Sequence, residues 1–405
     1  MLRTVPVRRR LTLLGPAFVA AIAYVDPGNV ATNVTAGSRF GYTLVWVVVL
    51  ANVMAVLVQY LSAKLGLVTG TSLAEQMGRR LPRAVRVTYW AQAELVAVAT
   101  DIAEVVGGAL ALYLLFGLPL LVGALVTTAV SVAILVTGDR RGQGVLERVI
   151  MAFLLLIAVG FTAGLFVDPP PPADIAGGLV PDFDGPASVL LASGIIGATV
   201  MPHVIYLHSG LTAGRMGVRS LGFSVRELLA VTRLDVVTAL LVAGALNLSL
   251  LLVAATSLQG LPGTDSLAGV HALMGSELGA GVALLFAVAL LGSGLASTSV
   301  GCAAGAEVMQ GLLHRRISVL VRRLVTAVPA FVVLAAGVEP GYALVMSQVV
   351  LSVGIPFALV PLVLLTANRR LMGAHVNRAG TTVAAGVVVV VVVTLNLVLL
   401  GLTLG

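Results

Sequence analysis

The chain has 405 residues, of which 59% are hydrophobic and 10% are charged, and its formal net charge is +7 at pH 7. A mean hydropathy of +1.08 is typical of a protein that crosses a membrane many times, and it excludes a soluble domain. The positive charge does not indicate nucleic-acid binding, because the basic residues lie in short connections between apolar runs, where Lys and Arg orient a chain in the membrane.

Apolar runs long enough to cross about 30 Å of hydrocarbon follow one another along the chain. They predict an all-α polytopic membrane protein with about eleven transmembrane helices, at 11–36, 43–69, 85–116, 119–137, 145–167, 187–212, 228–256, 281–312, 320–337, 341–366 and 380–402. Basic connections alternate with acidic ones along the chain. This alternation predicts that the N-terminal residues 1–10 are cytoplasmic and that the C-terminus is extracellular or periplasmic.

The first predicted span is interrupted by the polar sequence Asp26-Pro27-Gly28-Asn29. Pro27 has no N–H to donate, and Gly28 costs about 1 kcal/mol in a helix interior, so we expect the helix to unwind here. Within lipid, the freed carbonyls are tolerated only where they face protein, water or an ion. A carboxylate beside bare carbonyls therefore indicates an ion site, and the alternative is a kinked helix whose Asp26 pairs with a structural arginine.

The second break appears at the corresponding position of the second half of the chain. The Pro- and Gly-rich connection 168–186 divides the first ten spans into two groups of five, 11–167 and 187–366, and leaves 380–402 as an extra helix. Five spans per group predict an inverted repeat. The opening span of the second group contains Gly197-Ala198-Thr199-Val200-Met201-Pro202-His203. Discontinuous helices at matching positions predict a transporter whose substrate binds at the breaks.

The two breaks together offer a mixed set of metal ligands. Asp26 provides an anionic oxygen, Asn29 an amide oxygen, and the broken turns offer carbonyls such as those of Ala23 and Ala198. Oxygen-only sites suit magnesium and calcium, whereas the thioether of Met201 shifts the preference toward transition metals. The predicted substrate is therefore a divalent transition ion such as manganese or iron, although methionine is in general more often a core filler.

A second group of ionisable residues lies on the third span, the second break and the ninth span. Its members are Glu94, Asp101, Glu104, His203, Arg322 and Arg323. The three carboxylates, at i, i+7 and i+10, share one helix face, where they are costly unless they meet water or cations. We interpret the group as a proton route with Asp101 as the main acceptor. The alternative is a static salt-bridge network.

Three further polar residues leave alternatives open. Gln348 of the tenth span either completes the metal shell in one conformation or makes a helix-to-helix hydrogen bond. His208 belongs either to the proton route or to packing and gating, and packing or gating is favoured. Asp235 lies near Arg226 and Arg233 at a predicted membrane edge, so we expect a surface ion pair.

Several functions are excluded by what the sequence lacks. The GxxxxGK[ST] loop of nucleotide-binding proteins does not occur, so ATP is not expected to drive transport, and the HExxH and GxSxG motifs of membrane hydrolases do not occur either. The single cysteine, Cys302, excludes an intrachain disulfide and a cysteine-based metal cluster. We expect a non-enzymatic secondary transporter without a cofactor, functional as a monomer in the bilayer. A metal sensor, a channel and an organic-solute transporter on the same fold are the alternatives.

Four of these motifs carry a family resemblance. They are Ala23-Tyr24-Val25-Asp26-Pro27-Gly28-Asn29, Met201-Pro202-His203, Thr100-Asp101-Ile102-Ala103-Glu104 and Ser347-Gln348-Val349-Val350-Leu351-Ser352. They resemble, in that order, the first-helix metal motif, its sixth-helix partner, the third-helix proton pathway and the tenth helix of the Nramp family of divalent-metal transporters. The likeness extends from about residue 11 to the C-terminus.

The resemblance implies a LeuT-type 5+5 inverted repeat with broken first and sixth helices. It implies proton-coupled uptake of manganese or ferrous iron, with cadmium and cobalt as further substrates, across the cell membrane. The implied metal ligands are Asp26, Asn29, Met201, the carbonyls of Ala23 and Ala198, and in some states Gln348, and the implied proton network comprises His203, Glu94, Asp101, Glu104, Arg322 and Arg323.

The chain also departs from the family pattern at a few positions. A related magnesium-transporting branch departs from the pattern at the methionine of the sixth helix, and the presence of Met201 here argues against magnesium. Val204 stands where many relatives have asparagine, and Cys302 and Ala306 alter the usual eighth-helix signature. These departures concern local packing and transport rate, not the metal site.

Overall fold

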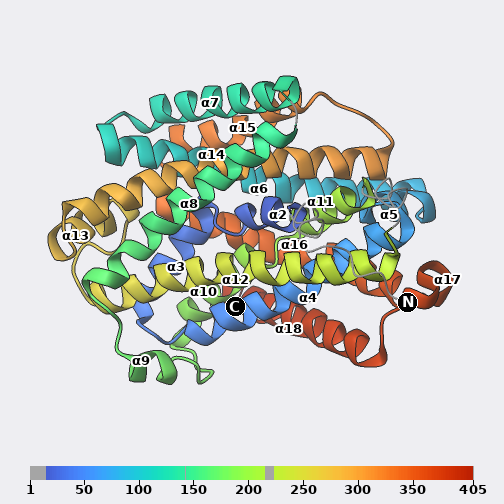
Figure 1. The fold of residues 1–405 in the computed structure, drawn as a ribbon. Coiled ribbons are helices and arrows are strands. Elements are labelled where there is room, and N and C mark those ends of the chain that lie inside the picture. The colour runs from blue at the N-terminus through green and yellow to red at the C-terminus, as the bar shows by residue number, and fades with distance from the viewer. Residues whose placement is uncertain (1–14, 142, 215–222, 405) are drawn as a thin grey trace.

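The computed structural model describes residues 15–141, 143–214 and 223–404 of the chain (Figure 1). Within these ranges, every regular element is a helix. The predicted cytoplasmic N-terminus, residues 1–10, and the start of the first predicted span, residues 11–14, lie outside the described residues.

The long apolar helices match the predicted spans. Seven segments in the described ranges are long and apolar enough to cross a membrane: α4 (Val45–Thr69), α6 (Arg83–Phe116), α10 with α11 (Gly185–Ala213), α12 (Val225–Ser257), α14 (Ala280–Leu313), α16 (Pro340–Thr366) and the Ala379–Leu402 part of α18. The other four predicted spans correspond to α2 with α3 (Pro16–Ala23 and Pro27–Phe40), α7 (Leu120–Arg141), α8 (Gln143–Val167) and α15 (Val319–Ala335). Each predicted apolar run therefore contains a helix or a pair of helices.

Short helices also occur in segments that we had predicted to be connections. They are α5 (Leu73–Arg80), α9 (Pro172–Gly177), α13 (Leu267–Glu277), α17 (Arg369–Met372) and the 3-10 turn η2 (Gly373–His375). Hydropathy missed them because they are too short or too polar to span a membrane. A local signal was present for α5, since Ser72 and Glu75 form a capping box at its start.

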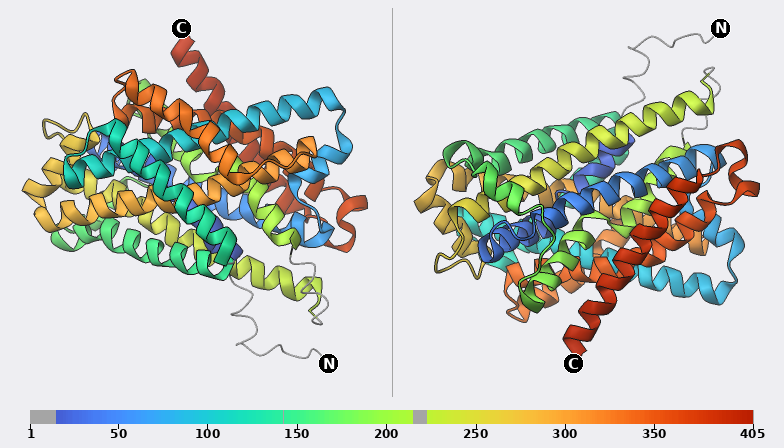
Figure 2. Two further views of the ribbon diagram at one scale, coloured as in Figure 1. Left: turned by 90° about the horizontal axis from the view of Figure 1, so that it is seen from above. Right: turned by 90° about the horizontal axis from the view of Figure 1, so that it is seen from below.

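The two broken segments lie in the middle of the bundle. Helices α3, α10 and α11 are buried over most of their length. Helix α12 packs on α3, α11 on α4, α10 on α16, and α14 along α6. Helices α7 and α15 cover one side of this core in Figure 1, and α18 lies on the opposite side. The views in Figure 2 show the C-terminal end of α18 projecting beyond the body. This arrangement places both breaks away from lipid.

One expectation about a charged residue is wrong. Asp235 on α12 is only 2% exposed, so it lies inside the bundle and not at the surface. Its two carboxylate oxygens accept hydrogen bonds from the backbone N–H groups of Gly15 and Ala17, each at 3.1 Å. The first N–H groups of a helix have no partner within the helix, and a carboxylate also interacts favourably with the positive end of the helix dipole. Asp235 therefore holds the start of α2 against α12.

The division of the chain into repeats stays a prediction in its detailed boundaries. The predicted limits are 11–167, 187–366 and 380–402. Residues 11–14 lie outside the described residues, α8 ends at Val167, α10 begins at Gly185, α16 ends at Thr366 and α18 begins at Ala379. The two pairs of half-helices, α2–α3 and α10–α11, open the two groups of five spans.

Candidate functional site

Proline spacing explains which backbone groups are free at the two breaks. Helix α2 ends at Ala23, and Pro27 is the first residue of α3. Because a proline has no N–H, Pro27 leaves the carbonyl four residues earlier, that of Ala23, without its helical donor. Pro202, the first residue of α11, does the same for Ala198. The sequence predicts both of these carbonyls as metal ligands.

Two other carbonyls of the first break are held by neighbouring helices. The side-chain amide of Asn247 on α12 donates to the carbonyl oxygen of Tyr24 at 2.8 Å. The hydroxyl of Ser293 on α14 donates to the carbonyl oxygen of Val25. These bonds satisfy the unwound turn on one side. Sequence reasoning missed both residues, because a single polar residue in an apolar run does not reveal which backbone group it meets.

Asn29 joins the two breaks. Asp26 caps α3, and its Oδ1 accepts from the backbone N–H and from the side-chain Nδ2 of Asn29, both at 2.8 Å. The same Nδ2 donates to the carbonyl oxygen of Ala198 at 2.9 Å. Asp26 is 1% exposed and Asn29 is fully buried. The amide thus lies between the carboxylate of one break and the freed carbonyl of the other.

Unpaired oxygen atoms at the breaks fit a cation. Asn29 Oδ1 and Gln348 Oε1 are buried and have no hydrogen-bond partner among the described residues. A buried acceptor without a partner is costly, whereas carboxylate and amide oxygens are the ligands of hard and borderline cations. Met201 is fully buried at the cap position of α11, between Ala198 and the rest of that helix. The described chain has no group of three His, Cys, Asp or Glu side chains suited to a metal, so a metal here would have mostly neutral ligands.

Gln348 approaches the carboxylate across a glycine. Its Nε2 lies 3.4 Å from Asp26 Oδ2 and 3.1 Å from Ser347 Oγ. A Cβ on Gly28 would lie 1.6 Å from the same Nε2 and 2.4 Å from the Gln348 Cδ. The absence of a side chain at Gly28 is therefore what lets α16 bring Gln348 to the break.

Replacing Gly28 with alanine should separate Gln348 from Asp26. Overpacking a close-packed site costs about 1–3 kcal/mol, so we expect the KM for Mn²⁺ uptake to rise by about tenfold. Gly386→Ala is the matched control, because a Cβ there meets nothing within 4 Å. The measurement is concentration-dependent Mn²⁺ uptake by both variants. Equal KM values for Gly28→Ala, Gly386→Ala and the parent would contradict the contact.

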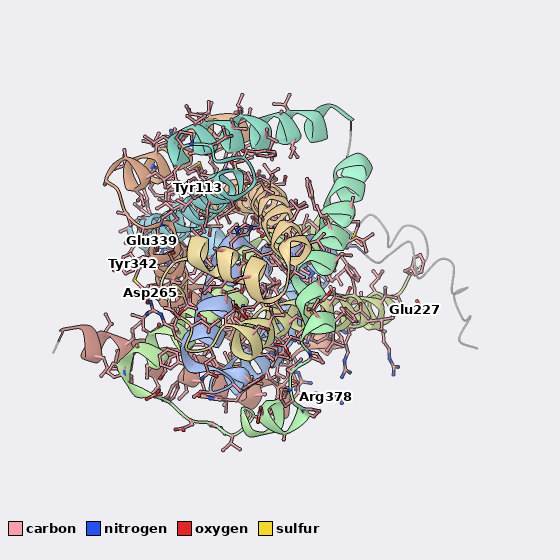
Figure 3. All side chains as sticks on the ribbon, turned by 90° about the vertical axis from the view of Figure 1, so that its left-hand side faces the viewer. Tyr113, Glu227, Asp265, Glu339, Tyr342 and Arg378 are labelled. Carbon is pink, nitrogen blue, oxygen red and sulfur yellow. The ribbon has the colours of Figure 1, made fainter. Side chains whose placement is uncertain are left out.

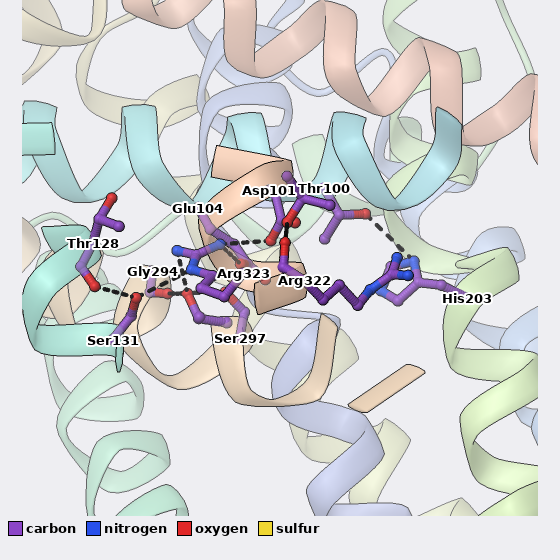
Figure 4. A network of polar contacts seen from close by, with 12 residues as sticks. Thr100, Asp101, Glu104, Thr128, Ser131, His203, Gly294, Ser297, Arg322 and Arg323 are labelled. Carbon is purple, nitrogen blue, oxygen red and sulfur yellow. Dashed lines mark hydrogen bonds and ion pairs between the residues drawn. The ribbon is translucent and has the colours of Figure 1, made fainter. Parts of the chain in front are cut away.

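A buried arginine organises the second group of predicted residues (Figure 4). Arg323 on α15 has no exposed side-chain surface, and its NH1 lies 2.5 Å from Asp101 Oδ1 and 3.3 Å from Glu104 Oε2. Its remaining nitrogens donate to Ser131 Oγ at 3.1 Å and to Thr298 Oγ1 at 3.3 Å. A guanidinium that meets two carboxylates and two hydroxyls keeps its charge compensated within the membrane.

Glu94, the remaining carboxylate of this group, pairs with Arg322. Both terminal nitrogens of Arg322 lie 2.9 Å from the two oxygens of Glu94, a paired arrangement that suits guanidinium and carboxylate. The Glu94 side chain is 23% exposed, whereas that of Glu104 is fully buried. The expected pairing of the third-span carboxylates with Arg322 and Arg323 is confirmed, and Glu94 lies nearest to the surface.

His203, next to Pro202 of the second break, lies beside the α6 residues of the ionisable group. Its Nδ1 is 3.5 Å from the hydroxyl of Thr100, the residue before Asp101, and its Nε2 has no hydrogen-bond partner among the described residues. Helix α6, which carries Asp101 and Glu104, also packs against the first break. A Cβ on Gly107 of α6 would lie 2.1 Å from the Cβ of Pro27. Helix α6 therefore contacts the first break close to the carboxylates that it carries.

His208 lies farther along α11 and faces α4. Its Nδ1 is 2.9 Å from Gln59 Oε1, and the side chain is 1% exposed. This contact is of the kind expected for a histidine in packing or gating, the use that the sequence favoured. The glutamine partner was not predicted, although it is a polar residue inside an apolar run.

A pocket lies beyond the breaks, on the side predicted to be extracellular. Its volume is about 500 Å³, and its lining includes Thr35 of α3, Leu191 of α10 and Met346 of α16. Asp265 and Glu339 add negative charge at this pocket, and Figure 3 shows them close together with Tyr342. Arg39, which also lines the pocket, is paired with Asp265 at 3.5 Å.

The fold and site define a polytopic membrane protein of the LeuT type, with two half-helix pairs meeting at a buried carboxylate. The solved structure of MhsT has the same fold, with a TM-score of 0.60 over 94% of this chain and 98% of that chain at 15% sequence identity. That likeness concerns the fold alone.

The chain belongs to the Nramp family, since residues 17–402 match the model described as natural resistance-associated macrophage protein-like. It is 58% identical over 391 residues to the divalent metal cation transporter MntH of Mycobacterium tuberculosis, covering 96% of this chain and 91% of that protein. It is also similar to the crystal structure of the Eremococcus coleocola manganese transporter, with a TM-score of 0.87 and 30% identity over 98% of this chain and 88% of that chain. The resemblance seen in the motifs is confirmed at the level of the family.

Proposed function

We propose that this protein is a secondary transporter that imports divalent transition metal ions, chiefly Mn²⁺ and Fe²⁺, with Cd²⁺ and Co²⁺ as further substrates. The import is coupled to protons and proceeds by alternating access. The observation that carries the metal assignment is the meeting of Asp26, Asn29 and the Ala198 carbonyl at two helix breaks. The relatives reported above are transporters of divalent metal cations or of manganese.

The proposed metal ligands are the side chains of Asp26, Asn29 and Met201 and the carbonyls of Ala23 and Ala198. Gln348 joins them in some conformations. One carboxylate keeps the net charge of the site low, and the sulfur of Met201 disfavours calcium and magnesium relative to softer ions. Burial of all these groups means that the ion leaves its water behind, so the ligands must replace its hydration shell.

The proposed proton route uses the second group of residues. His203 is next to Pro202 of the second break, and its free Nε2 can accept a proton. From there, Thr100 leads to Asp101, and Arg323 connects Asp101 with Glu104. Arg322 and Glu94 lie at the more exposed end. In this proposal, His208 is a gating contact of α11 rather than a proton carrier. Chains of ionisable side chains inside a membrane are typical of proton relays.

The orientation, location and assembly belong to the same proposal. The protein lies in the cell membrane with a cytoplasmic N-terminus and an extracellular or periplasmic C-terminus, as the alternation of loop charge indicates. The arrangement needs one chain only, because both breaks and both ionisable groups come from the same bundle. A monomer is therefore the proposed functional unit.

Transport by the purified protein in proteoliposomes tests the proposal. We expect Mn²⁺ uptake to be faster when the outside is acidic, and inward Mn²⁺ flux to acidify the lumen. Unlabelled Mn²⁺ inside the vesicle should accelerate entry of labelled Mn²⁺, because a carrier exchanges its substrate whereas a channel or a sensor does not. Mn²⁺ entry without acidification of the lumen would contradict proton coupling. Failure of unlabelled Mn²⁺ to accelerate entry of labelled Mn²⁺ would contradict a carrier mechanism.

Replacing Met201 with alanine should reduce discrimination more than it reduces Mn²⁺ uptake. The oxygen ligands remain, while the soft contribution is lost. We expect Mn²⁺ uptake to stay within about tenfold of the parent, while Ca²⁺ becomes an effective competitor. Met274→Ala is the control, because Met274 is also buried but lies on α13. If Met201→Ala excludes calcium as well as the parent does, Met201 is not a ligand.

A further inference from the structure

Helix α16 contains two internal prolines, and both follow Gln348. They are Pro356 and Pro361. Each proline deprives the carbonyl four residues earlier of its helical donor, so the two unsatisfied carbonyls belong to Ser352 and Phe357. A carbonyl without a donor is costly at membrane depth unless another group supplies one.

The carbonyl of Ser352 receives its donor from the last helix. Nδ2 of Asn396 on α18 lies 2.9 Å from the Ser352 carbonyl oxygen. Oδ1 of Asn396 accepts from the hydroxyl of Ser352 at 2.9 Å and from that of Ser193 on α10 at 3.4 Å. Asn396 is 7% exposed, although the helix that carries it otherwise presents many side chains to lipid. One buried amide therefore joins α18, α16 and α10.

The carbonyl of Phe357 also receives a side-chain donor, in this case from α11. The hydroxyl of Tyr206 on α11 donates to it at 3.5 Å, and Tyr206 is 1% exposed. Both carbonyls freed within α16 thus have side-chain donors from other helices. The carbonyl of Ala198, freed by the same proline spacing, also accepts from a side chain, that of Asn29, and it lies with the Ala23 carbonyl at the proposed metal site.

The carbonyl that Asn396 binds lies on the same segment of α16 as Gln348. Ser352 is one turn beyond Gln348 on α16. Helix α10 packs directly on this turn, because a Cβ on Gly197 would lie 2.1 Å from the carbonyl oxygen of Gln348 and 2.7 Å from the N of Ser352. A change in the backbone geometry around Ser352 and Pro356 would therefore move Gln348 relative to both α10 and Asp26.

We propose that Asn396 is a positioning residue for Gln348. Its amide replaces the hydrogen bond that Pro356 removes, and this fixes the turn of α16 that holds Gln348 beside Asp26. Tyr206 plays the corresponding part at Pro361. The extra helix α18, which lies outside the two groups of five spans, thereby acts on metal affinity without touching the metal. The inference rests on the proposed function of Gln348 as a metal ligand.

A double-mutant cycle tests the dependence on the missing N–H. Asn396→Leu should raise the KM for Mn²⁺ by about tenfold, which corresponds to about 1.4 kcal/mol, with a smaller change in maximal rate. Pro356→Ala restores the backbone donor, so adding Asn396→Leu to Pro356→Ala should change KM by no more than about twofold. Thr394→Leu, an exposed polar-to-leucine change on the same helix, should leave KM unchanged.

Thermal unfolding in detergent follows the same cycle independently of transport. Asn396→Leu should lower the unfolding temperature clearly in the parent and only slightly in the Pro356→Ala background. If Asn396→Leu fails to accumulate in the membrane, Pro356→Ala should restore its accumulation. An equal effect of Asn396→Leu in both backgrounds, or a failure of Pro356→Ala to restore accumulation, overturns the inference.

Gln348→Ala separates this inference from the proposed function. If Gln348→Ala leaves the KM for Mn²⁺ unchanged, Gln348 is not a ligand, and that part of the proposed function fails. If Gln348→Ala raises KM but Asn396→Leu does not, the proposed function stands and the positioning role of Asn396 is wrong. If both raise KM and the double variant is no worse than Gln348→Ala alone, Asn396 acts through Gln348, as inferred.

Discussion

Replacement of Asp26 with asparagine is expected to lower Mn²⁺ uptake by more than about 100-fold, since changes even in groups that only orient metal ligands cost about 10- to 100-fold. Asp26 supplies the negative charge at the two breaks, and a neutral amide cannot compensate a divalent ion stripped of its water. Asparagine can still cap α3 through its side-chain oxygen, so the fold should survive. The measurement is initial uptake in proteoliposomes, with thermal unfolding as the check on folding.

A surface carboxylate provides the control for the Asp26 substitution. Asp265→Asn also removes one negative charge, but its side chain is 92% exposed and pairs with Arg39 at 3.5 Å. We expect near-parental Mn²⁺ uptake for Asp265→Asn. Uptake by Asp26→Asn at half the parental rate or more would show that the ion binds elsewhere.

Replacement of Arg323 with methionine should have the largest effect on stability. It leaves Asp101 and Glu104 buried without their cation, and breaking a buried ion pair by removing one partner costs about 3–5 kcal/mol. We expect a strong fall in the unfolding temperature or the loss of protein from the membrane. Fluorescence-detected size exclusion after heating measures this on small amounts of protein.

Removing the stranded charges should restore the fold. The triple variant Arg323→Met, Asp101→Asn, Glu104→Gln has no uncompensated charge, so its stability should approach that of the parent. The control is Arg39→Met, which breaks the exposed pair with Asp265 and should change stability by less than about 1 kcal/mol. If the triple variant is as unstable as Arg323→Met alone, the cost comes from lost packing of the arginine and not from stranded carboxylates.

Local chemistry was sufficient to locate both helix breaks. Pro27 and Pro202 remove backbone donors and stand beside polar residues in apolar runs, so the two interruptions followed from the sequence. Pro356 and Pro361, in contrast, lie inside the continuous helix α16. The helical face shared by Asp101 and Glu104 followed from the periodicity of the helix, and a buried cation facing it followed from the cost of unpaired charge. In each case, the cause lies within a few residues of the effect.

Contacts between distant helices could not be predicted from the sequence in this way. Asp235 was expected at the surface because its neighbours in sequence are basic, yet it caps the start of α2 more than 200 positions away. Asn396 is one polar residue in a run of valine and leucine, and its amide donates to the carbonyl of Ser352 on another helix. Sequence spacing carries no signal for such partners.

The sequence by itself determined the membrane class, the positions of the long apolar helices, the two interruptions and the ligand types that they offer. Those features depend on hydropathy, on the covalent structure of proline and on helical periodicity, all of which are local. Only the tertiary structure decided which donors meet which freed carbonyls. Asn29 bridges the two breaks, and Arg323 joins the two α6 carboxylates. Such pairings arise because an unpaired polar group is costly in a low-dielectric interior, and the packing of distant helices selects the partner.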